Sequence, residues 1–356
     1  MEIILDCDLM KFPNSGLYYY CLYLGNHVQN QLDSMGNIKM GYYIPNDAAK
    51  VFQRKDNCIA AKKYHRFFKP FMWNCRVWHA PFQSGRIVPD KRKYKNVKIL
   101  LTIHDINSLH EGKSFEDQKR DVAHVQQLID RSDAVVCISG FTRNDVFKHC
   151  DVGRKPVYVI YNGTSNLMPS SLHPNSYKPK RPFLFGMGYV NQKKNYHVLL
   201  SLLKANEDIE LLIAGRLDDP DYIQNMKQIA KQSGVEERLR ILGPVTENEK
   251  SWYLSNCDAF MHPSRAEGFG LPVIEAMSFG KPVFASRLTS LPEIGGDAAF
   301  YFSSFEENHI QHTFHQGMLL YKSKADDMVV TLKKRSQEFN WEKSAAEYIK
   351  VYQSLY

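Results

Sequence analysis

Long apolar runs are missing from this sequence. No stretch approaches the ~20 consecutive apolar residues that a membrane-spanning helix needs, and the chain opens with the acidic Glu2 instead of a basic, apolar signal. These absences predict a cytoplasmic protein. Peripheral attachment to the inner face of the membrane stays open, because it needs no spanning helix.

Metal and disulfide patterns are missing as well. The seven cysteines form no CxxC pair and lie at positions 7, 21, 58, 75, 137, 150 and 257. An odd number without ligand spacing predicts neither a zinc site nor a disulfide framework, so we expect reduced thiols and no metal-binding residues. No internal repeat of fixed period is found, which disfavours a solenoid or a propeller.

Positive charge is in excess, with a formal net charge of +8. Anionic substrates, an anionic membrane surface or nucleic acid would suit such a charge. No nucleic-acid-binding module accompanies it, so nucleic acid is not an expected partner.

Much of this charge gathers in region 50–95. Its basic residues are Arg54, Lys55, Lys62, Lys63, Arg66, Lys69, Lys91, Arg92, Lys93 and Lys95, and Phe67, Phe68, Phe71, Met72 and Trp73 lie among them. Two interpretations remain open. The region is either solvated lysines beside ordinary core aromatics, or a patch with which a peripheral enzyme contacts a membrane surface.

What the sequence does contain indicates an α/β protein of two domains. Its 356 residues are about twice the usual single-domain size, and short apolar runs alternate with longer amphipathic stretches. Strands are expected at 3–6, 77–80, 97–103, 134–138 and 157–161, and then at 183–185, 211–214, 239–242, 259–261 and 283–285. Helices are expected from Asn195 and from Pro220.

Residues 165–182 separate the two series of strands. They are rich in Pro, Ser and Lys without periodicity, which is typical of a linker. We therefore expect domains at 1–170 and 171–338. The last segment, 339–356, spaces apolar residues at helical intervals and is predicted to form an amphipathic terminal helix.

The most informative stretch, 262–282, reads HPSRAEGFGLPVIEAMSFGKP. Gly268 and Gly270 allow a tight turn and a close approach of the backbone to a ligand. Pro272 suits the first turn of a helix, whose amides form an anion site, and Gly280 ends that helix after about two turns. The stretch therefore predicts a pyrophosphate site.

Two carboxylates flank this turn. Glu267 lies before the helix and Glu275 lies just inside it. Glu275 can accept hydrogen bonds from the vicinal hydroxyls of a ribose, as acidic residues do in other nucleotide sites. Glu267 would lie closer to whatever follows the phosphates.

The string EGFGLPVIEAM resembles the Glu-x7-Glu signature of family 4 retaining glycosyltransferases. The resemblance implies the GT-B fold, in which two Rossmann-like domains face each other across a cleft and a C-terminal helix crosses back to the N-terminal domain. The first domain would bind the acceptor and the second the nucleotide sugar. Glu267 would lie at the donor sugar, and Glu275 would bind ribose. The diphosphate would be held by the backbone of Gly268, Phe269, Gly270 and Leu271.

Weaker motifs extend the resemblance. The string MGYVNQKKN at 187–195 is similar to the family's glycine-rich strand end and basic pair, which implies phosphate contacts by Lys193 and Lys194. Lys193 stands where the family more often has Arg. The loop around Gly16 is similar to the family's N-terminal glycine loop, and His104 with Asp105 to a His-Asp pair whose His contacts the transferred sugar.

The resemblance implies a retaining hexosyltransferase, closest to bacterial polysaccharide mannosyltransferases. It would move a hexosyl unit, with mannose favoured, to a glycan or lipid-linked acceptor in cell-surface polysaccharide synthesis. GDP-mannose is the favoured donor and a UDP-sugar the second candidate. Neither a cofactor nor a divalent metal is expected, and the catalytic candidates are His104, Lys194 and Glu267.

Other interpretations carry less weight. The fold could serve an inactive sugar-nucleotide-binding homologue. Asp6 and Asp8 have the Asp-x-Asp form of metal-dependent GT-A transferases, although this position at a strand end favours a turn. The stretch from Gly186 partly imitates a dinucleotide fingerprint, but Asn191 replaces its third glycine.

Overall fold

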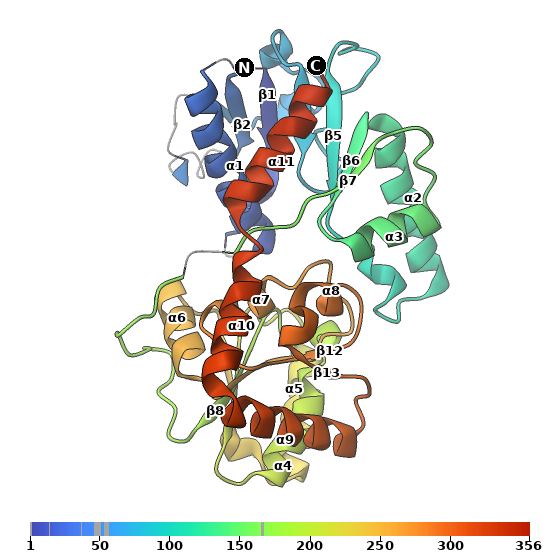
Figure 1. Cartoon of the computed structure of the whole chain (residues 1–356). Helices are drawn as coiled ribbons and strands as arrows, with labels where there is room; N and C mark the ends of the chain where they lie inside the picture. The colour runs from blue at the N-terminus through green and yellow to red at the C-terminus, as the bar shows by residue number, and fades with distance from the viewer. Residues whose placement is uncertain (1, 14, 37, 46–50, 53–56, 165–166) are drawn as a thin grey trace. The chain divides into compact units, whose positions relative to one another are not determined.

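The computed structural model describes residues 2–13, 15–36, 38–45, 51–52, 57–164 and 167–356 (Figure 1). The chain divides into two compact units. Unit 1 contains Met1–Gly163 together with Phe339–Tyr356, and unit 2 contains Thr164–Glu338. Each unit has a parallel sheet with helices on both faces, so the α/β prediction is confirmed.

Unit 1 is built on a seven-stranded sheet with the order β3-β2-β1-β4-β5-β6-β7, in which every pair is parallel. The strands are β1 (Ile3–Asp6), β2 (Met40–Ile44), β3 (Cys58–Ala60), β4 (Val77–Ala80), β5 (Lys98–Ile103), β6 (Ala134–Cys137) and β7 (Val157–Val159). Separate apolar clusters cover the two faces, which explains the continuous apolar runs of the central strands.

The helices of unit 1 are α1 (Gly16–Met35), α2 (Phe115–Arg131), α3 (Gly140–His149) and α11 (Trp341–Ser354). The Ser15 side chain caps α1, and Gly36 ends it with φ 75°. Helix α11 packs beside α1, and Trp341, Tyr348 and Tyr352 lie in the same apolar cluster as β1 (Figure 1). The predicted return of the terminal helix to the N-terminal domain is therefore confirmed.

Unit 2 is built on a six-stranded parallel sheet with the order β10-β9-β8-β11-β12-β13. The strands are β8 (Phe183–Met187), β9 (Glu210–Ala214), β10 (Leu239–Gly243), β11 (Ala259–His262), β12 (Val283–Ser286) and β13 (Phe300–Phe302). The helices are α4 (Leu200–Ala205), α5 (Pro220–Gln232), α6 (Glu247–Asn256), α7 (Leu271–Ser278), α8 (Leu291–Gly295), α9 (Glu307–Ser323) and α10 (Ala325–Gln337).

One predicted helix start is wrong. Asn195 adopts φ 59°, so it lies outside any right-handed helix, and a 3-10 turn over Tyr196–Leu199 precedes α4. Residues 165–166 of the expected linker and Asn14 of the expected glycine loop lie outside the described residues. Among the helices described, none is both long enough and apolar enough to pass through a bilayer.

Candidate functional site

The candidate site of unit 2 lies at the carboxyl edge of its sheet, where the strand order reverses direction. In the sheet, β8 lies between β9 and β11. The chain continues from β8 towards β9 and from β11 towards β12, so the loops after β8 and β11 turn away from each other. Open parallel sheets bind ligands at such a switch point. The predicted residues 193–194 and 267–271 lie in and just after these two loops.

The loop after β11 leads through a glycine turn into α7. Gly270 has φ 112° and ψ 44°, a conformation that an L side chain rarely adopts, and it is the N-cap of α7. The helix has 8 residues with a proline in its first turn, and Gly280 follows its end with φ 70°. The predicted two-turn helix between glycine signals is therefore confirmed.

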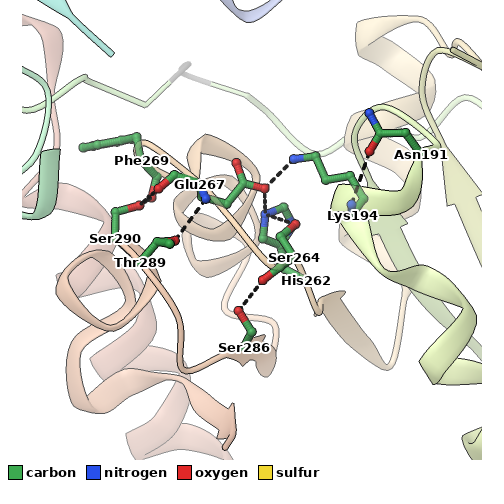
Figure 2. A network of polar contacts seen from close by, with 9 residues as sticks. All are labelled: Asn191, Lys194, His262, Ser264, Glu267, Phe269, Ser286, Thr289 and Ser290. Carbon is green, nitrogen blue, oxygen red and sulfur yellow. Dashed lines mark hydrogen bonds and ion pairs between the residues drawn. The ribbon is translucent and has the colours of Figure 1, made fainter. Parts of the chain in front are cut away.

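Side chains from the loop after β12 hold this turn in place (Figure 2). The Ser290 hydroxyl lies 2.8 Å from the Glu267 carbonyl oxygen and 2.9 Å from that of Phe269. The Glu267 amide donates to Thr289 Oγ1 at 3.0 Å. The sequence pattern did not indicate Thr289 or Ser290, because they are distant along the chain and carry no motif of their own.

Glu267 forms the centre of a buried charged cluster (Figure 2). Lys194 Nζ lies 2.5 Å from its Oε1, and His262 Nε2 lies 2.9 Å from the same oxygen. Burial opposes ionisation of Glu267, but Lys194 and His262 overcome it and hold the pKa of Glu267 well below its usual range. Glu267 is therefore a carboxylate that only accepts hydrogen bonds.

His262 is the neutral member of this cluster. Burial lowers its pKa in spite of the neighbouring Glu267 carboxylate. Because Glu267 accepts, Nε2 carries the proton of the neutral ring. The sequence placed His262 at the start of the informative stretch but assigned it no role, and the contact supplies one: His262 orients the Glu267 carboxylate.

Local backbone geometry brings Lys194 to Glu267. Asn191 caps a short turn over Gln192–Lys194 by accepting from the Lys194 amide at 3.2 Å. Gly188 has φ 146°, and a Cβ there would lie 2.9 Å from Lys194 Cε. The glycine thus leaves room for the lysine stem.

The loops after β8 and β11 are also joined through their backbones. The Arg265 amide donates to the Lys193 carbonyl oxygen at 2.8 Å. The Arg265 side chain contacts Asn195 Oδ1 at 3.2 Å. These contacts hold both predicted lysines beside the loop that carries Glu267.

Glu275 occupies a separate part of the site, on α7. Its Oε1 accepts from Lys250 Nζ of α6 at 3.0 Å, and the same ammonium lies 3.0 Å from Glu247 Oε2. Burial disfavours the charged form of Lys250, but Glu275 and Glu247 raise its pKa above the ordinary value. Lys250 was not predicted, since a lysine on an amphipathic helix is usually solvated.

Unit 1 holds the other two predicted residues, Gly16 and His104. Gly16 is the first residue of α1, and a Cβ there would meet no described atom within 4 Å. His104 follows β5, and its ring lies edge-on against Tyr20 of α1 with centroids 4.7 Å apart. Tyr20 thus connects the helix that begins at Gly16 to His104.

The protonation of His104 follows from its contacts. Burial lowers its pKa to about 4, so the ring is neutral at pH 7. Its Nε2 lies 2.7 Å from the Pro81 carbonyl oxygen, which can only accept. Nε2 therefore carries the proton, and Nδ1 is the acceptor of the ring.

The basic, aromatic region contains both buried and exposed aromatic or apolar side chains. Met72 is buried and Phe71 packs against Trp78, as expected for core residues. Phe67 and Trp73 are 72% and 94% exposed. Arg54 and Lys55 lie outside the described residues. The core interpretation is thus confirmed for Met72 and Phe71, and membrane contact by the exposed residues stays a prediction.

Two family models match the chain. Residues 171–318 match the model of glycosyl transferases group 1, and residues 57–165 match that of glycosyltransferase family 4. O-antigen chain mannosyltransferase B of Escherichia coli is 32% identical over 288 residues, which cover 72% of this chain and 71% of that protein.

Other relatives match over a smaller share. O-antigen chain mannosyltransferase RfbU of Salmonella typhimurium is 25% identical over 59% of this chain and 58% of its own length. Lipopolysaccharide core biosynthesis mannosyltransferase LpsB of Rhizobium meliloti is 28% identical over 65% of this chain and 64% of its own. The chain thus spans less than two thirds of the length of these two relatives.

Solved structures resemble the chain over its whole length. Sucrose-phosphate synthase from Thermosynechococcus elongatus has a TM-score of 0.80 at 18% identity and covers 100% of this chain and 99% of its own. Anabaena HepE in complex with UDP-glucose has a TM-score of 0.73 at 15% identity and covers 99% of this chain and 100% of its own. At such identities the likeness shows the fold, and the predicted GT-B fold is confirmed.

Proposed function

Because the chain belongs to the group 1 glycosyltransferases, we propose that it is a retaining hexosyltransferase that uses a nucleotide diphosphate sugar. One observation carries the proposal. The Lys194 ammonium and the Glu267 carboxylate lie 2.5 Å apart, directly before the glycine turn that begins α7. A cation, an acceptor-only carboxylate and a helix N-terminus are the groups that a diphosphate and its attached sugar require.

The donor diphosphate would lie at the turn from Gly268 to Leu271. There the N-terminus of α7 contributes a partial positive charge, and Lys194 contributes a full one. When the bond between the sugar and the phosphate breaks, negative charge grows on the leaving diphosphate. Lys194, with Lys193 beside it, would stabilise that charge in a site that is already organised before the reaction.

Glu267 would position the transferred sugar. Because it is held as a carboxylate, it accepts hydrogen bonds from sugar hydroxyls and does not act as a general acid. Glu275 would bind the ribose hydroxyls, with Lys250 fixing one of its oxygens. His104 would offer Nδ1 as an acceptor to the same sugar.

We assign no covalent nucleophile to the protein. The acceptor hydroxyl oxygen would bond to the anomeric carbon on the face that the diphosphate leaves. The departing phosphate oxygen would receive the hydroxyl proton, so atoms and charge balance without a protein base or a divalent metal. The metal-dependent alternative belongs to the GT-A fold and is dropped, because this chain has the GT-B fold.

The relatives support a choice of substrates. Three of them bear the name mannosyltransferase, two for the O-antigen chain and one for the lipopolysaccharide core. We therefore favour GDP-mannose as donor and a glycan or lipid-linked acceptor of a cell-surface polysaccharide. A UDP-sugar is the second candidate, since HepE has been solved with UDP-glucose.

The test compares donor binding with turnover. GDP-mannose or UDP-glucose should raise the melting temperature of the purified chain, and the preferred donor should be hydrolysed or transferred equally well with and without EDTA. Glu267→Gln should lower turnover on the order of 100-fold. Glu237→Gln, at an exposed position of unit 2, is the control.

Two outcomes would count against the enzyme. Near-normal turnover of Glu267→Gln would remove Glu267 from the site. A donor that raises the melting temperature but is never turned over would favour the inactive sugar-nucleotide-binding homologue.

A further inference from the structure

Unit 1 contains a cavity of about 990 Å³ that the proposed donor chemistry does not use. It is formed by segment 61–69 after β3, by segment 84–94 and by the last turns of α2. Its volume lies at the upper end of the range of about 300–1,000 Å³ found for ligand pockets. A ligand as large as a sugar with a diphosphate would therefore fit.

The lining of this cavity is strongly basic. Seven of its residues are Lys or Arg, against two Asp. One of the two, Asp8, already pairs with Lys11 at 2.9 Å and lies 3.7 Å from Arg86. The other, Asp90, accepts from the Arg92 amide at 2.9 Å. The charge that remains would attract a multiply charged anion.

Lys69 distinguishes this cavity from a solvated basic surface. Its side chain lines the cavity although the residue is only 4% exposed. Its amide donates to the Tyr94 hydroxyl at 2.9 Å, and within the described part of the chain no hydrogen bond is found for its ammonium. A largely buried lysine without a protein partner for its charge is costly, and an anion in the cavity would reduce that cost.

The surroundings of Lys69 increase this cost. Burial lowers its pKa, and the neighbouring Arg131 and Lys93 lower it further, against the opposing effect of Asp6 and Asp90. The other six cations are exposed and could be solvated independently of any ligand. Lys69 is the one buried residue among the seven cations, so an anion in the cavity would gain more from pairing with it than with the exposed ones.

We propose that this cavity binds a phosphate or diphosphate group on the acceptor. The inference rests on the proposed function and narrows its acceptor to a phosphate-bearing glycan or lipid-linked sugar. Phosphate fits better than a single carboxylate, because it carries more charge and more acceptor oxygens for several lysines and arginines. Lys69 would contact the most buried phosphate oxygen, and Arg66 and Arg131 would contact the outer ones.

The experiment measures binding of inorganic pyrophosphate to the full chain by calorimetry. Lys69→Met keeps an unbranched apolar stem and removes the charge, and Arg66→Gln alters an exposed lining residue. Lys148→Met, at an exposed position of α3 outside the cavity, is the matched control. Because pyrophosphate can also enter the donor site, the series is repeated with Lys194→Gln present.

With Lys194→Gln present, we expect both cavity variants to weaken pyrophosphate binding at least about tenfold. Lys148→Met should bind like the parent chain. Unchanged affinity in both cavity variants would overturn the proposal. Arg66→Gln keeps the test decisive if Lys69→Met does not fold.

A second arm separates an acceptor phosphate from a membrane lipid. The same variants are sedimented with phosphatidylglycerol vesicles and with phosphatidylcholine vesicles. If the cavity variants lose vesicle binding but keep the parent affinity for pyrophosphate, the cavity region binds a lipid surface and the proposal is overturned.

Thermal shifts with GDP and UDP separate this inference from the proposed function. Lys69→Met should keep the nucleotide shift, whereas Lys194→Gln should lose it. If no nucleotide shifts any variant while the cavity variants still lose pyrophosphate, the proposed function fails and the anion site stands.

Discussion

Asp6 shows how burial can change the protonation of a side chain. It is the last residue of β1 and is 8% exposed, and burial raises its pKa to about 7. An amide hydrogen bond from Asp8 at 3.1 Å lowers this value only in part. In the Asp-x-Asp pattern, Asp6 ends β1 and Asp8 begins a 3-10 turn, as the position of the pattern in the sequence favoured.

The raised pKa makes the free energy of unfolding depend on pH. Between pH 3.8 and about 7 the folded state keeps the Asp6 proton while the unfolded state has lost it. The contribution of Asp6 to stability therefore falls as the pH rises through this window, and it is constant above. As the pH rises across this window, the free energy of unfolding of Asp6→Asn should increase relative to that of the parent by up to about 4 kcal/mol.

Urea unfolding at a series of pH values measures this difference. Asp326→Asn, at an exposed position of α10, serves as control. A stability difference between Asp6→Asn and the parent that stays constant from pH 4 to pH 8 would contradict the assignment.

At the residue scale, the sequence indicated single groups better than their contacts. Glu267 and Lys194 came from two separate motifs, and their ion pair spans 73 positions that no local pattern connects. Lys250 and Ser290 hold Glu275 and the glycine turn, but neither residue itself belongs to a motif in the sequence. Such partners become visible only when the sheet order is known.

Among the elements, α11 depends on a buried chain of hydrogen bonds. The Tyr348 hydroxyl lies 2.6 Å from that of Tyr20 and 3.2 Å from Thr102 Oγ1. Thr102 in turn contacts His79 at 2.8 Å, and His79 contacts the Tyr352 hydroxyl at 2.8 Å. This chain joins α11 to α1 and to two central strands.

Tyr348→Phe should lower the free energy of unfolding by about 1–3 kcal/mol, because it leaves buried partners unsatisfied. In a double-mutant cycle with Tyr20→Phe, the double variant should lose less stability than the two single variants lose together. Chemical denaturation of the four proteins measures the coupling. Tyr356→Phe, at an exposed position, is the control, and additive effects would show that the pair is not coupled.

The sequence predicted most strands, including the edge strands β7 and β10, but it missed β2, β3 and β13 and several helices. Apolar runs such as 97–103 and 134–138 are buried on both faces, so composition alone locates them. The missed edge strands β3 and β13 have only three residues each. Helices α9 and α10 were missed because only a few of their residues are buried, which leaves a weak apolar period.

For the whole molecule, the placement of the last segment predicts how truncation acts. Residues 339–356 belong to unit 1, and Trp341, Ala345 and Ile349 are buried in its core. Removing them should expose the face of the sheet that α1 and α11 cover. Unit 1 should then lose its cooperative unfolding transition, whereas unit 2, which contains none of these residues, should keep its own.

Scanning calorimetry of the chain ended at Glu338 checks this expectation. A chain lacking only Tyr356, which is 46% exposed, is the control. A truncated chain that keeps every transition of the parent would contradict the role given to α11.

The discontinuity of unit 1 also sets an order of events during synthesis. Unit 2 is one uninterrupted segment, so it can complete its fold soon after residue 338 has left the ribosome. The first 163 residues are made earlier, yet the sheet face that α1 covers lacks its second helix, α11, until residues 341–354 emerge. Unit 1 thus stays incomplete while the whole of unit 2 is made, and it is where chaperones should bind.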